Sequence, residues 1–278
     1  MHIDKEAYQE AVGESLEKMK DYKHYQRFIE LAGNSHLSAR NLCAVLGTNP
    51  EASEVGTLKY WNKRQFIIKA KEKGIKILMP SPDNPKEFVG GVVFDQKQIT
   101  ASEKAIQQGK KAYEHTYPYI GTKEGLKQFL EHFNKGIGEM RVDQSKAPIE
   151  NSSRQGAMIT IDSKLKPNQQ AQAVLLEYAR FVMGKNMASN GEINQSYFEN
   201  EFKAVTMASI MGRRLGFSLE EPELLMNKPL KPFLLENTPF QLEKLLSDSV
   251  NKANKSLFQV SRAFFKSKEA QQEIKMTI

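Results

Sequence analysis

Apolar and aromatic side chains near the start of the chain recur with the spacing of an α-helix. The recurring positions are Ala11, Leu16, Met19, Tyr22, Tyr25 and Phe28, with polar residues between them. Because a helical period places such positions on one face, the pattern predicts a helix over residues 5–32. The sequence Gly33-Asn34-Ser35 that follows is typical of a break between elements.

A second, shorter helix is predicted to begin after Ser38, whose hydroxyl is suited to cap the first backbone N–H groups. Leu42, Val45 and Leu46 would form its apolar face. The pair Asn49-Pro50 is expected to end it, because the residue before a proline avoids the helical conformation.

The hydrophobic period then changes to two. Phe66 and Ile68 alternate with their neighbours, and so do Ile75, Ile77 and Met79, which predicts two short strands. The connection over residues 71–74, Lys-Glu-Lys-Gly, predicts that these strands form a hairpin.

Residues 88–95, Phe-Val-Gly-Gly-Val-Val-Phe-Asp, predict a third strand with a bulge or a close backbone approach at Gly90-Gly91. The polar, lysine- and glutamine-rich residues 96–114 are predicted to be a linker between two halves of the chain.

The second half has mainly helical spacing. Helices are predicted over residues 122–135, 167–183, 194–215, 239–262 and 267–275, with one short strand over 157–161. The sequence therefore predicts an α+β protein of two domains. These are a small N-terminal helix-plus-β-hairpin domain, residues 1–105, and a mainly helical domain, residues 106–278.

The composition of the chain limits the classes of protein to which it can belong. Cys43 is the single cysteine, so the chain holds neither a disulfide framework nor a cysteine-based zinc site, and the count fits a reducing cytosol. The sequence has no run of about 20 apolar residues and no apolar core of a signal peptide, so we expect a cytoplasmic protein without a membrane partner. Glycine-rich phosphate loops and the Gly-x-Ser-x-Gly pattern are also absent from the sequence.

The net charge of +7 is concentrated in one place. The segment from Lys59 to Lys76, called the basic segment below, holds seven basic residues against the single acid Glu72, and so contributes +6. A basic patch of this kind indicates a polyanionic partner.

Aromatic residues lie within the same segment. Tyr60, Trp61 and Phe66 alternate with the cations, and single-stranded nucleic acid is bound by charges that contact phosphates and rings that stack on bases. The alternative interpretation is a solvated basic face above a core tryptophan. The predicted DNA-binding residues are Lys59, Tyr60, Trp61, Lys63, Arg64, Lys69, Lys71, Lys73 and Lys76.

Three stretches of the first half match parts of one known type of domain. They are residues 49–61, NPEASEVGTLKYW, residues 69–80, KAKEKGIKILMP, and residues 92–95, VVFD. In this order they resemble the opening, the hairpin and the closing strand of the N-terminal domain of the ArdC-type antirestriction protein family. The resemblance implies binding of single-stranded DNA, in a family carried by conjugative plasmids and phages in which some members counter host restriction. This chain departs from the pattern in two places: Gln65-Phe66 replaces a Gly-Arg pair, and Lys71 replaces the hairpin glycine.

The order of elements in the second half resembles the zincin-type metallopeptidase domain of the same family. There a helix carries His-Glu-x-x-His, and a glutamate on a later helix completes the zinc site. Leu176 and Arg180 stand here at the two histidine positions, Glu177 at the general-base position, and Glu201 at the third ligand.

The resemblance therefore implies a zincin-like fold that has lost its metal, with no catalytic residue and no cofactor. Leucine offers no lone pair, and arginine stays protonated. Arg180 is expected to replace the zinc as the counter-charge of Glu177 and Glu201. The alternative interpretation is that residues 169–183 form an ordinary core helix with a few polar positions.

Three functions remain open from the sequence. The first is a non-enzymatic single-stranded DNA-binding protein of a plasmid, conjugative element or phage, with an antirestriction role. The second is a metal-dependent peptidase with atypical ligands. The third is an interaction module whose peptidase-like groove binds a host or element-encoded protein.

Overall fold

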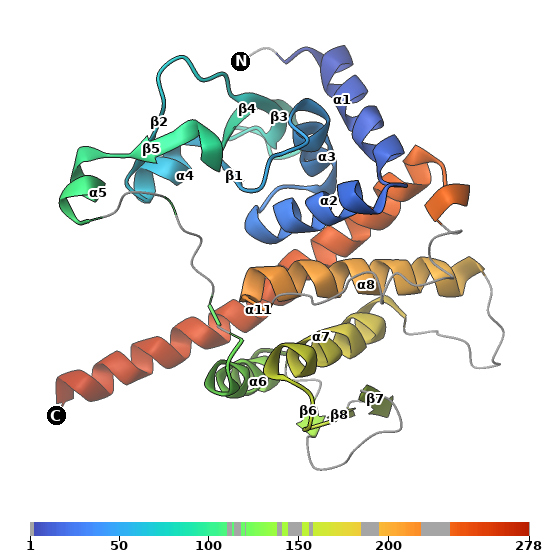
Figure 1. The fold of residues 1–278 in the computed structure, drawn as a ribbon, viewed down its shortest axis with the longest axis vertical. Coiled ribbons are helices and arrows are strands. Elements are labelled where there is room, and N and C mark those ends of the chain that lie inside the picture. The colour runs from blue at the N-terminus through green and yellow to red at the C-terminus, as the bar shows by residue number, and fades with distance from the viewer. Residues whose placement is uncertain are drawn as a thin grey trace. The chain divides into compact units, whose positions relative to one another are not determined.

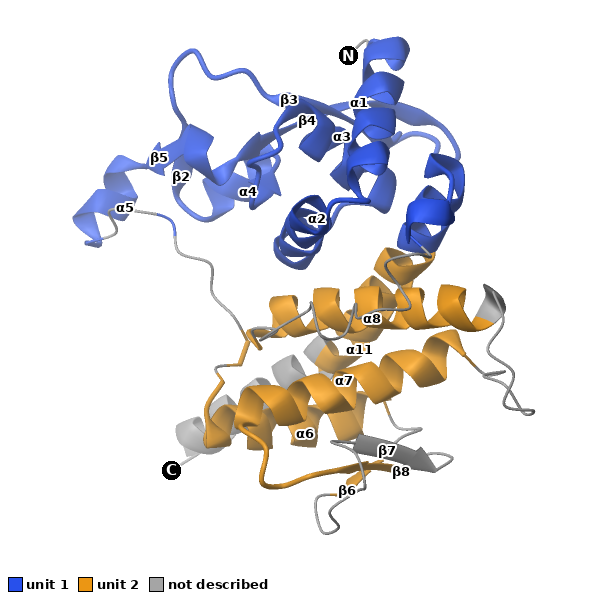
Figure 2. Ribbon diagram, turned by 45° about the vertical axis from the view of Figure 1, so that its right-hand side comes forward, with its two compact units in different colours: residues 1–116, 234–247 blue, residues 117–233, 248–278 orange. Residues whose placement is uncertain are grey.

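The computed structural model describes residues 3–109, 113, 118–119, 121–137, 141–143, 152–155, 158–184, 195–217 and 234–277, and the predicted α+β class is confirmed. The chain divides into two compact units (Figure 2). Unit 1 comprises Met1–Thr116 with Leu234–Ser247, and unit 2 comprises Tyr117–Phe233 with Asp248–Ile278. Residues 234–247, which the predicted boundary places in the second domain, are thus grouped with unit 1.

Unit 1 begins with three helices, α1 (Lys5–Lys18), α2 (Tyr22–Asn34) and α3 (Ala39–Thr48) (Figure 1). The single helix predicted over residues 5–32 is wrong, because the chain leaves the helical conformation at Asp21. The Asp21 carboxylate accepts a hydrogen bond from the Lys23 N–H and so starts a new helix. Met19, beside the break, is buried, which is why the apolar spacing continues across it.

The predicted cap of α3 is confirmed, since the Ser38 hydroxyl accepts from the Asn41 N–H. α3 packs closely against α1. At Gly47 an added Cβ would lie 2.0 Å from the Ala11 carbonyl oxygen, so only glycine allows this approach of the two backbones.

Unit 1 contains two small antiparallel sheets. The first has the order β1-β4-β3, from β1 (Val55–Gly56), β3 (Ile75–Pro80) and β4 (Phe88–Asp95). The second pairs β2 (Phe66–Ile68) with β5 (Ile99–Ala101), and α4 (Leu58–Lys63) precedes β2 in the chain.

The predicted hairpin between β2 and β3 is wrong, although both strands exist. Phe66 pairs with Ala101, whereas Ile75 pairs with Val93 on β4. Alternation of apolar residues identifies a strand but not its partner, and partners far apart in sequence leave no local signal. The third predicted strand is confirmed as β4.

The glycines of β4 allow a close approach and not a bulge. The pairing runs without interruption from Ile75↔Val93 to Pro80↔Phe88. An added Cβ on Gly91 would lie 2.3 Å from the Met79 Sδ, so the Met79 side chain occupies the space above this residue.

The predicted linker over residues 96–114 is also wrong within the described residues. It forms a 3-10 turn, η1 (Gln96–Gln98), then β5 and α5 (Glu103–Gln107). Ile99, Ala101 and Ala105 are buried against Trp61. In the sequence, these small or isolated apolar residues stand between lysines and glutamines. The composition of the segment alone therefore led to the wrong prediction of a linker.

Unit 2 is mainly helical, with a small sheet. α6 (Lys123–Ile137), α7 (Pro167–Met183) and α8 (Gln195–Leu215) appear where helices are predicted, and α7 packs against α8. β6 (Arg141–Asp143), β7 (Ser152–Gln155) and β8 (Met158–Ile161) have the order β6-β8-β7, with β8 parallel to β6 and antiparallel to β7.

α11 (Pro239–Thr277) is one helix, so the predicted break between residues 262 and 267 is wrong. The sequence after Pro239 contains neither glycine nor proline, and nothing in it interrupts helical hydrogen bonding. Within the described part of the chain, no helix is both long enough and apolar enough to cross a membrane.

Candidate functional site

The basic segment covers α4, β2 and the start of β3 in unit 1. All seven of its cationic side chains are exposed, and none forms an ion pair with a carboxylate among the described residues. They are Lys59, Lys63, Arg64, Lys69, Lys71, Lys73 and Lys76. A surface of this kind attracts anions, because no internal counter-charge neutralises it.

Two turns shape this surface, and both lie where the chain departs from the glycines of the ArdC pattern. Gln65 and Lys71 each have a φ of 68°, the left-handed conformation that glycine adopts at little cost. Lys71 therefore adds a charge to the surface in a backbone conformation that favours glycine.

Trp61 is not on this surface. Its side chain is 0% exposed, and its indole N–H donates to the Phe94 carbonyl oxygen at 2.9 Å. The Tyr60 and Tyr113 rings meet it edge-on, with centroids 4.9 and 5.0 Å away. A base stacks only on an accessible ring face, so this location contradicts the predicted stacking role of Trp61 and favours the core interpretation.

The hydroxyl end of the Tyr60 side chain also makes its contacts in the interior of unit 1. Its hydroxyl donates to Glu54 Oε1 at 2.5 Å, and the Tyr113 hydroxyl donates to the same oxygen at 2.7 Å. Burial, and then the hydrogen bond to Glu54, raises the pKa of Tyr113 to about 12 and raises that of Tyr60 further. The Arg64 guanidinium lies 3.7 Å above the Tyr60 ring, so one face of the ring is covered.

An exposed aromatic ring exists elsewhere in unit 1. Phe88, the first residue of β4, is 64% exposed and pairs across the strands with the exposed Pro80. Lys76, on β3, also pairs with a residue of β4, Val92. The sequence predicts only a strand at Phe88, because the pattern of residues in a strand does not reveal which of its positions stay exposed.

The second candidate site lies on α7 and α8 of unit 2, which run side by side (Figure 1). The Arg180 guanidinium contacts both predicted carboxylates. Its Nη1 donates to Glu177 Oε1 at 2.8 Å, and its Nε and Nη2 donate to the Glu201 carboxylate at 2.6–3.2 Å. The predicted contacts are therefore confirmed, and we call these three residues the Arg180 cluster.

The Arg180 cluster is largely removed from solvent. The side chains of Arg180, Glu177 and Glu201 are 30%, 9% and 12% exposed. Burial by itself lowers the pKa of Arg180, but the hydrogen bonds and charges of Glu201 and Glu177 outweigh it and hold the pKa above its usual value. Arg180 therefore stays charged, and the cluster keeps one cation between two carboxylates.

This arrangement does not fit a metal ion of the zincin type. The buried Leu176 side chain has no lone pair, and the guanidinium occupies the carboxylate oxygens that a cation would need. In the described ranges, no group of three histidine, cysteine, aspartate or glutamate side chains is arranged to hold a metal ion.

The fold is similar to that of a known antirestriction protein. Crystal structures of ArdC from plasmid R388 match the chain in a Mn(II)-bound form, with a TM-score of 0.51 and 11% identity over 92% of this chain and 97% of that one. The metal-free form matches with a TM-score of 0.50 and 10% identity over 92% of this chain and 98% of the other. No protein-family model and no curated protein matches the sequence. The resemblance seen in the sequence is thus confirmed as a shared fold.

Replacing Trp61 tests its place in the core. Trp61→Ala should lower the free energy of unfolding by about 3–5 kcal/mol, because it opens a cavity and leaves the Phe94 carbonyl without its donor. Trp61→Phe should cost less, since a large ring remains. Chemical denaturation followed by circular dichroism measures both. Unchanged stability in Trp61→Ala, together with weaker DNA binding, would show instead that Trp61 contacts DNA.

Replacing Arg180 tests the charge balance of its cluster. Arg180→Ala leaves two mostly buried carboxylates facing each other and should cost about 3–5 kcal/mol of unfolding free energy. Arg180→Lys, which keeps the charge but not the planar donors, should lie between that variant and the unmodified protein. A loss below about 0.5 kcal/mol in Arg180→Ala, the range of ordinary surface changes, would contradict this account.

Proposed function

We propose that the protein binds single-stranded DNA through the basic segment of unit 1 and acts as an antirestriction protein of a plasmid, conjugative element or phage. The observation that carries the proposal is the set of seven exposed cations without carboxylate partners in the described chain. The fold shared with ArdC of plasmid R388, described as an antirestriction protein, supports the biological setting.

The physical argument begins with phosphates. Each lysine that contacts a phosphate releases condensed counterions, so such a surface gives affinity that falls as salt rises. A flexible single strand can follow cations distributed over α4, the connection between β2 and β3, and the start of β3, and it exposes its bases to apolar side chains. Phe88, and not Trp61, offers an exposed ring for stacking, on the strand that pairs with the Lys76-bearing β3.

Unit 2, in this proposal, is a peptidase-like domain without peptidase activity. Its support is the Arg180 cluster, in which a guanidinium stands where the resemblance implies a histidine ligand and satisfies both glutamates. The alternative of a metal-dependent peptidase with atypical ligands requires Arg180 to leave these carboxylates. The metal ion would then have to compensate these two mostly buried charges without the imidazole ligands of the family pattern, since Leu176 offers no lone pair.

Salt dependence tests the DNA-binding proposal. The protein should bind an oligothymidine more tightly than a duplex of equal length. If four to six phosphates are contacted, the slope of log K against log salt should be about −3 to −4. The measurement is fluorescence anisotropy at several salt concentrations. Equal affinity for duplex, or a slope near zero, would refute single-strand binding by this surface.

The same titrations on variants separate the contribution of phosphate contacts from that of base stacking. Lys69→Ala and Lys73→Ala should each flatten the slope by about 0.7, one phosphate contact. Phe88→Ala should weaken binding by about 1–3 kcal/mol, one stacked base, with the slope unchanged. Lys252→Ala, which removes an exposed lysine of α11 in unit 2, is the matched control and should change neither quantity.

Metal binding by a restored site tests the degenerate-peptidase proposal. The unmodified protein should carry no stoichiometric zinc after equilibration and dialysis, measured by elemental analysis. The double variant Leu176→His with Arg180→His supplies two imidazoles one turn apart beside Glu201 and should take up about one equivalent. Zinc in the unmodified protein that is lost on Glu201→Ala would support the peptidase instead. Failure of the folded double variant to bind zinc would show that the assigned register is wrong.

A further inference from the structure

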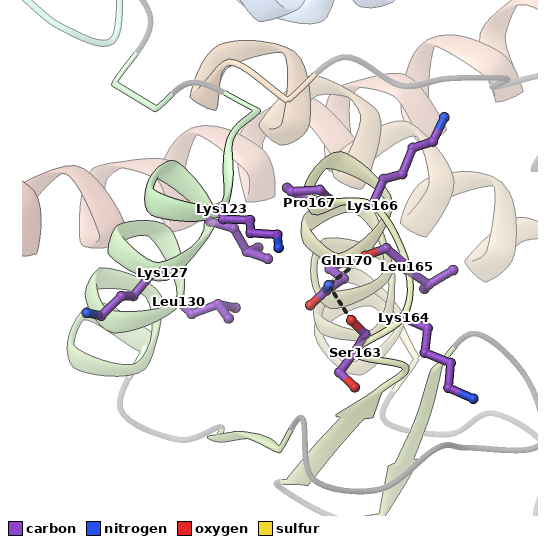
Figure 3. Close-up of a pocket in the computed structure, with 10 residues that line it drawn as sticks. Lys123, Lys127, Leu130, Ser163, Lys164, Leu165, Lys166, Pro167 and Gln170 are labelled. Carbon is purple, nitrogen blue, oxygen red and sulfur yellow. Dashed lines mark hydrogen bonds between the residues drawn. The ribbon is translucent and has the colours of Figure 1, made fainter.

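Unit 2 contains a hollow between α6 and the turn that precedes α7, with a volume of about 730 Å³ (Figure 3). This volume lies in the range of sites that hold small ligands or peptide segments, about 300–1,000 Å³. The Arg180 cluster contributes no residue to its walls, and the basic segment belongs to unit 1. The hollow therefore shares no residue with either candidate site described above.

Four lysines surround the hollow. Lys123 and Lys127 come from α6, and Lys164 and Lys166 from the turn. All four side chains are exposed, and none forms an ion pair within the described residues. No carboxylate of the described chain lines the space, so its rim is uniformly positive.

The acidic residues closest in sequence to these lysines make other contacts. Glu124 accepts from the Gln128 side chain, and Glu131 forms an ion pair with Lys135 at 2.8 Å. Asp162 Oδ1 accepts from the Lys164 backbone N–H at 2.9 Å and so helps to fix the turn. None of these three carboxylates lines the hollow, so the four lysines are the charged groups that a ligand in it would meet.

Hydrogen bonds from α7 side chains fix the turn that carries Lys164 and Lys166. The amide of the buried Gln170 donates to the carbonyl oxygens of Ser163 and Leu165 at 3.2 and 2.7 Å, as Figure 3 shows. The Lys166 N–H donates to the Gln169 side chain at 3.1 Å. Because these bonds fix the backbone, a ligand would bind a wall that is already formed, at a lower entropic cost.

The floor of the hollow is aliphatic. Leu126 and Leu130 lie on the same face of α6 as the two lysines, and Leu165 and Pro167 are the other apolar residues of the lining, beside Ser163 and Gln170. No aromatic ring of the described chain lines the space. Sites for single-stranded nucleic acid combine cations with aromatic rings for stacking, and this one offers only aliphatic surface between its cations.

We propose that this hollow binds an acidic segment of a partner protein in which aspartates or glutamates flank aliphatic side chains. The aliphatic side chains of the segment contact the leucines, and its carboxylates face the four lysines. The match is one of charge sign and of apolar surface together, which a phosphate ester or a nucleic acid does not provide. This assignment does not depend on the DNA-binding proposal for unit 1.

The test uses the full-length protein and a fluorescent ten-residue peptide made of glutamate and leucine. Anisotropy titration should show saturable binding that weakens as salt rises. The double variant Lys127→Glu with Lys164→Glu changes one lysine on each wall and should weaken binding by about tenfold or more, because attraction becomes repulsion at two points. Both side chains are exposed, so the fold should persist, and circular dichroism checks it.

Three comparisons complete the test. Lys252→Glu with Lys255→Glu makes the same charge change on the exposed face of α11 in unit 2 and should leave the affinity for the peptide within about twofold. A peptide in which glutamine replaces glutamate should bind at least about tenfold more weakly. Lys69→Ala with Lys73→Ala should weaken DNA binding and leave peptide binding unchanged, which separates the two proposals.

The proposal is overturned if the peptide does not bind, if the control pair weakens binding as much as the pair in the hollow, or if the glutamine peptide binds equally well. It is also overturned if an oligothymidine displaces the peptide from the Lys69→Ala, Lys73→Ala variant, since the hollow would then be a nucleic-acid site.

Discussion

Two carboxylates that face each other across packed helices repel unless a cation lies between them, and unit 2 is arranged around that constraint. Glu177 and Glu201 are both mostly buried, and Arg180 supplies donors to each of them. In a partly desolvated position the attraction between these charges is stronger than at the surface, and so is the cost of removing one of them. The α7–α8 pair therefore tolerates two mostly buried glutamates because the arginine is present.

In unit 1, by contrast, the charged side chains of the basic segment stay at the surface, and only its apolar side chains are buried. Trp61, Phe66 and Ile99 pack together, while the lysines beside them in sequence reach solvent. The buried Glu54 links the Tyr60 and Tyr113 hydroxyls and is therefore removed from the cations at the surface. The core and the basic surface are two consequences of the same alternation of residue types.

Local patterns in the sequence were sufficient for most helices, and the resemblance to the zincin-type domain predicted the contacts of the Arg180 cluster. A 3.6-residue period and a proline at the first helical position define α7 to its last residue, and the spacing of Glu177 and Arg180 places both on one face. Strand partners were not predictable, because β2 pairs with β5 some thirty residues away and only tertiary packing selects that partner. The folded residues 96–107 were missed for the same reason, since small apolar residues such as Ala101 and Ala105 show their role only against Trp61. The lysine-rimmed hollow needs α6 and the turn before α7 to meet in space, and no spacing in the sequence encodes that meeting.

The burial of Trp61 has a practical consequence for experiments. It is the only tryptophan in the chain, and it lies wholly inside unit 1 beside two tyrosines. Intrinsic tryptophan fluorescence therefore reports the folding of unit 1 alone, whereas far-ultraviolet circular dichroism averages the helices of both units. A protein of two units need not unfold in one step. Here the chain itself carries a label that distinguishes loss of unit 1 from loss of unit 2, without any added dye.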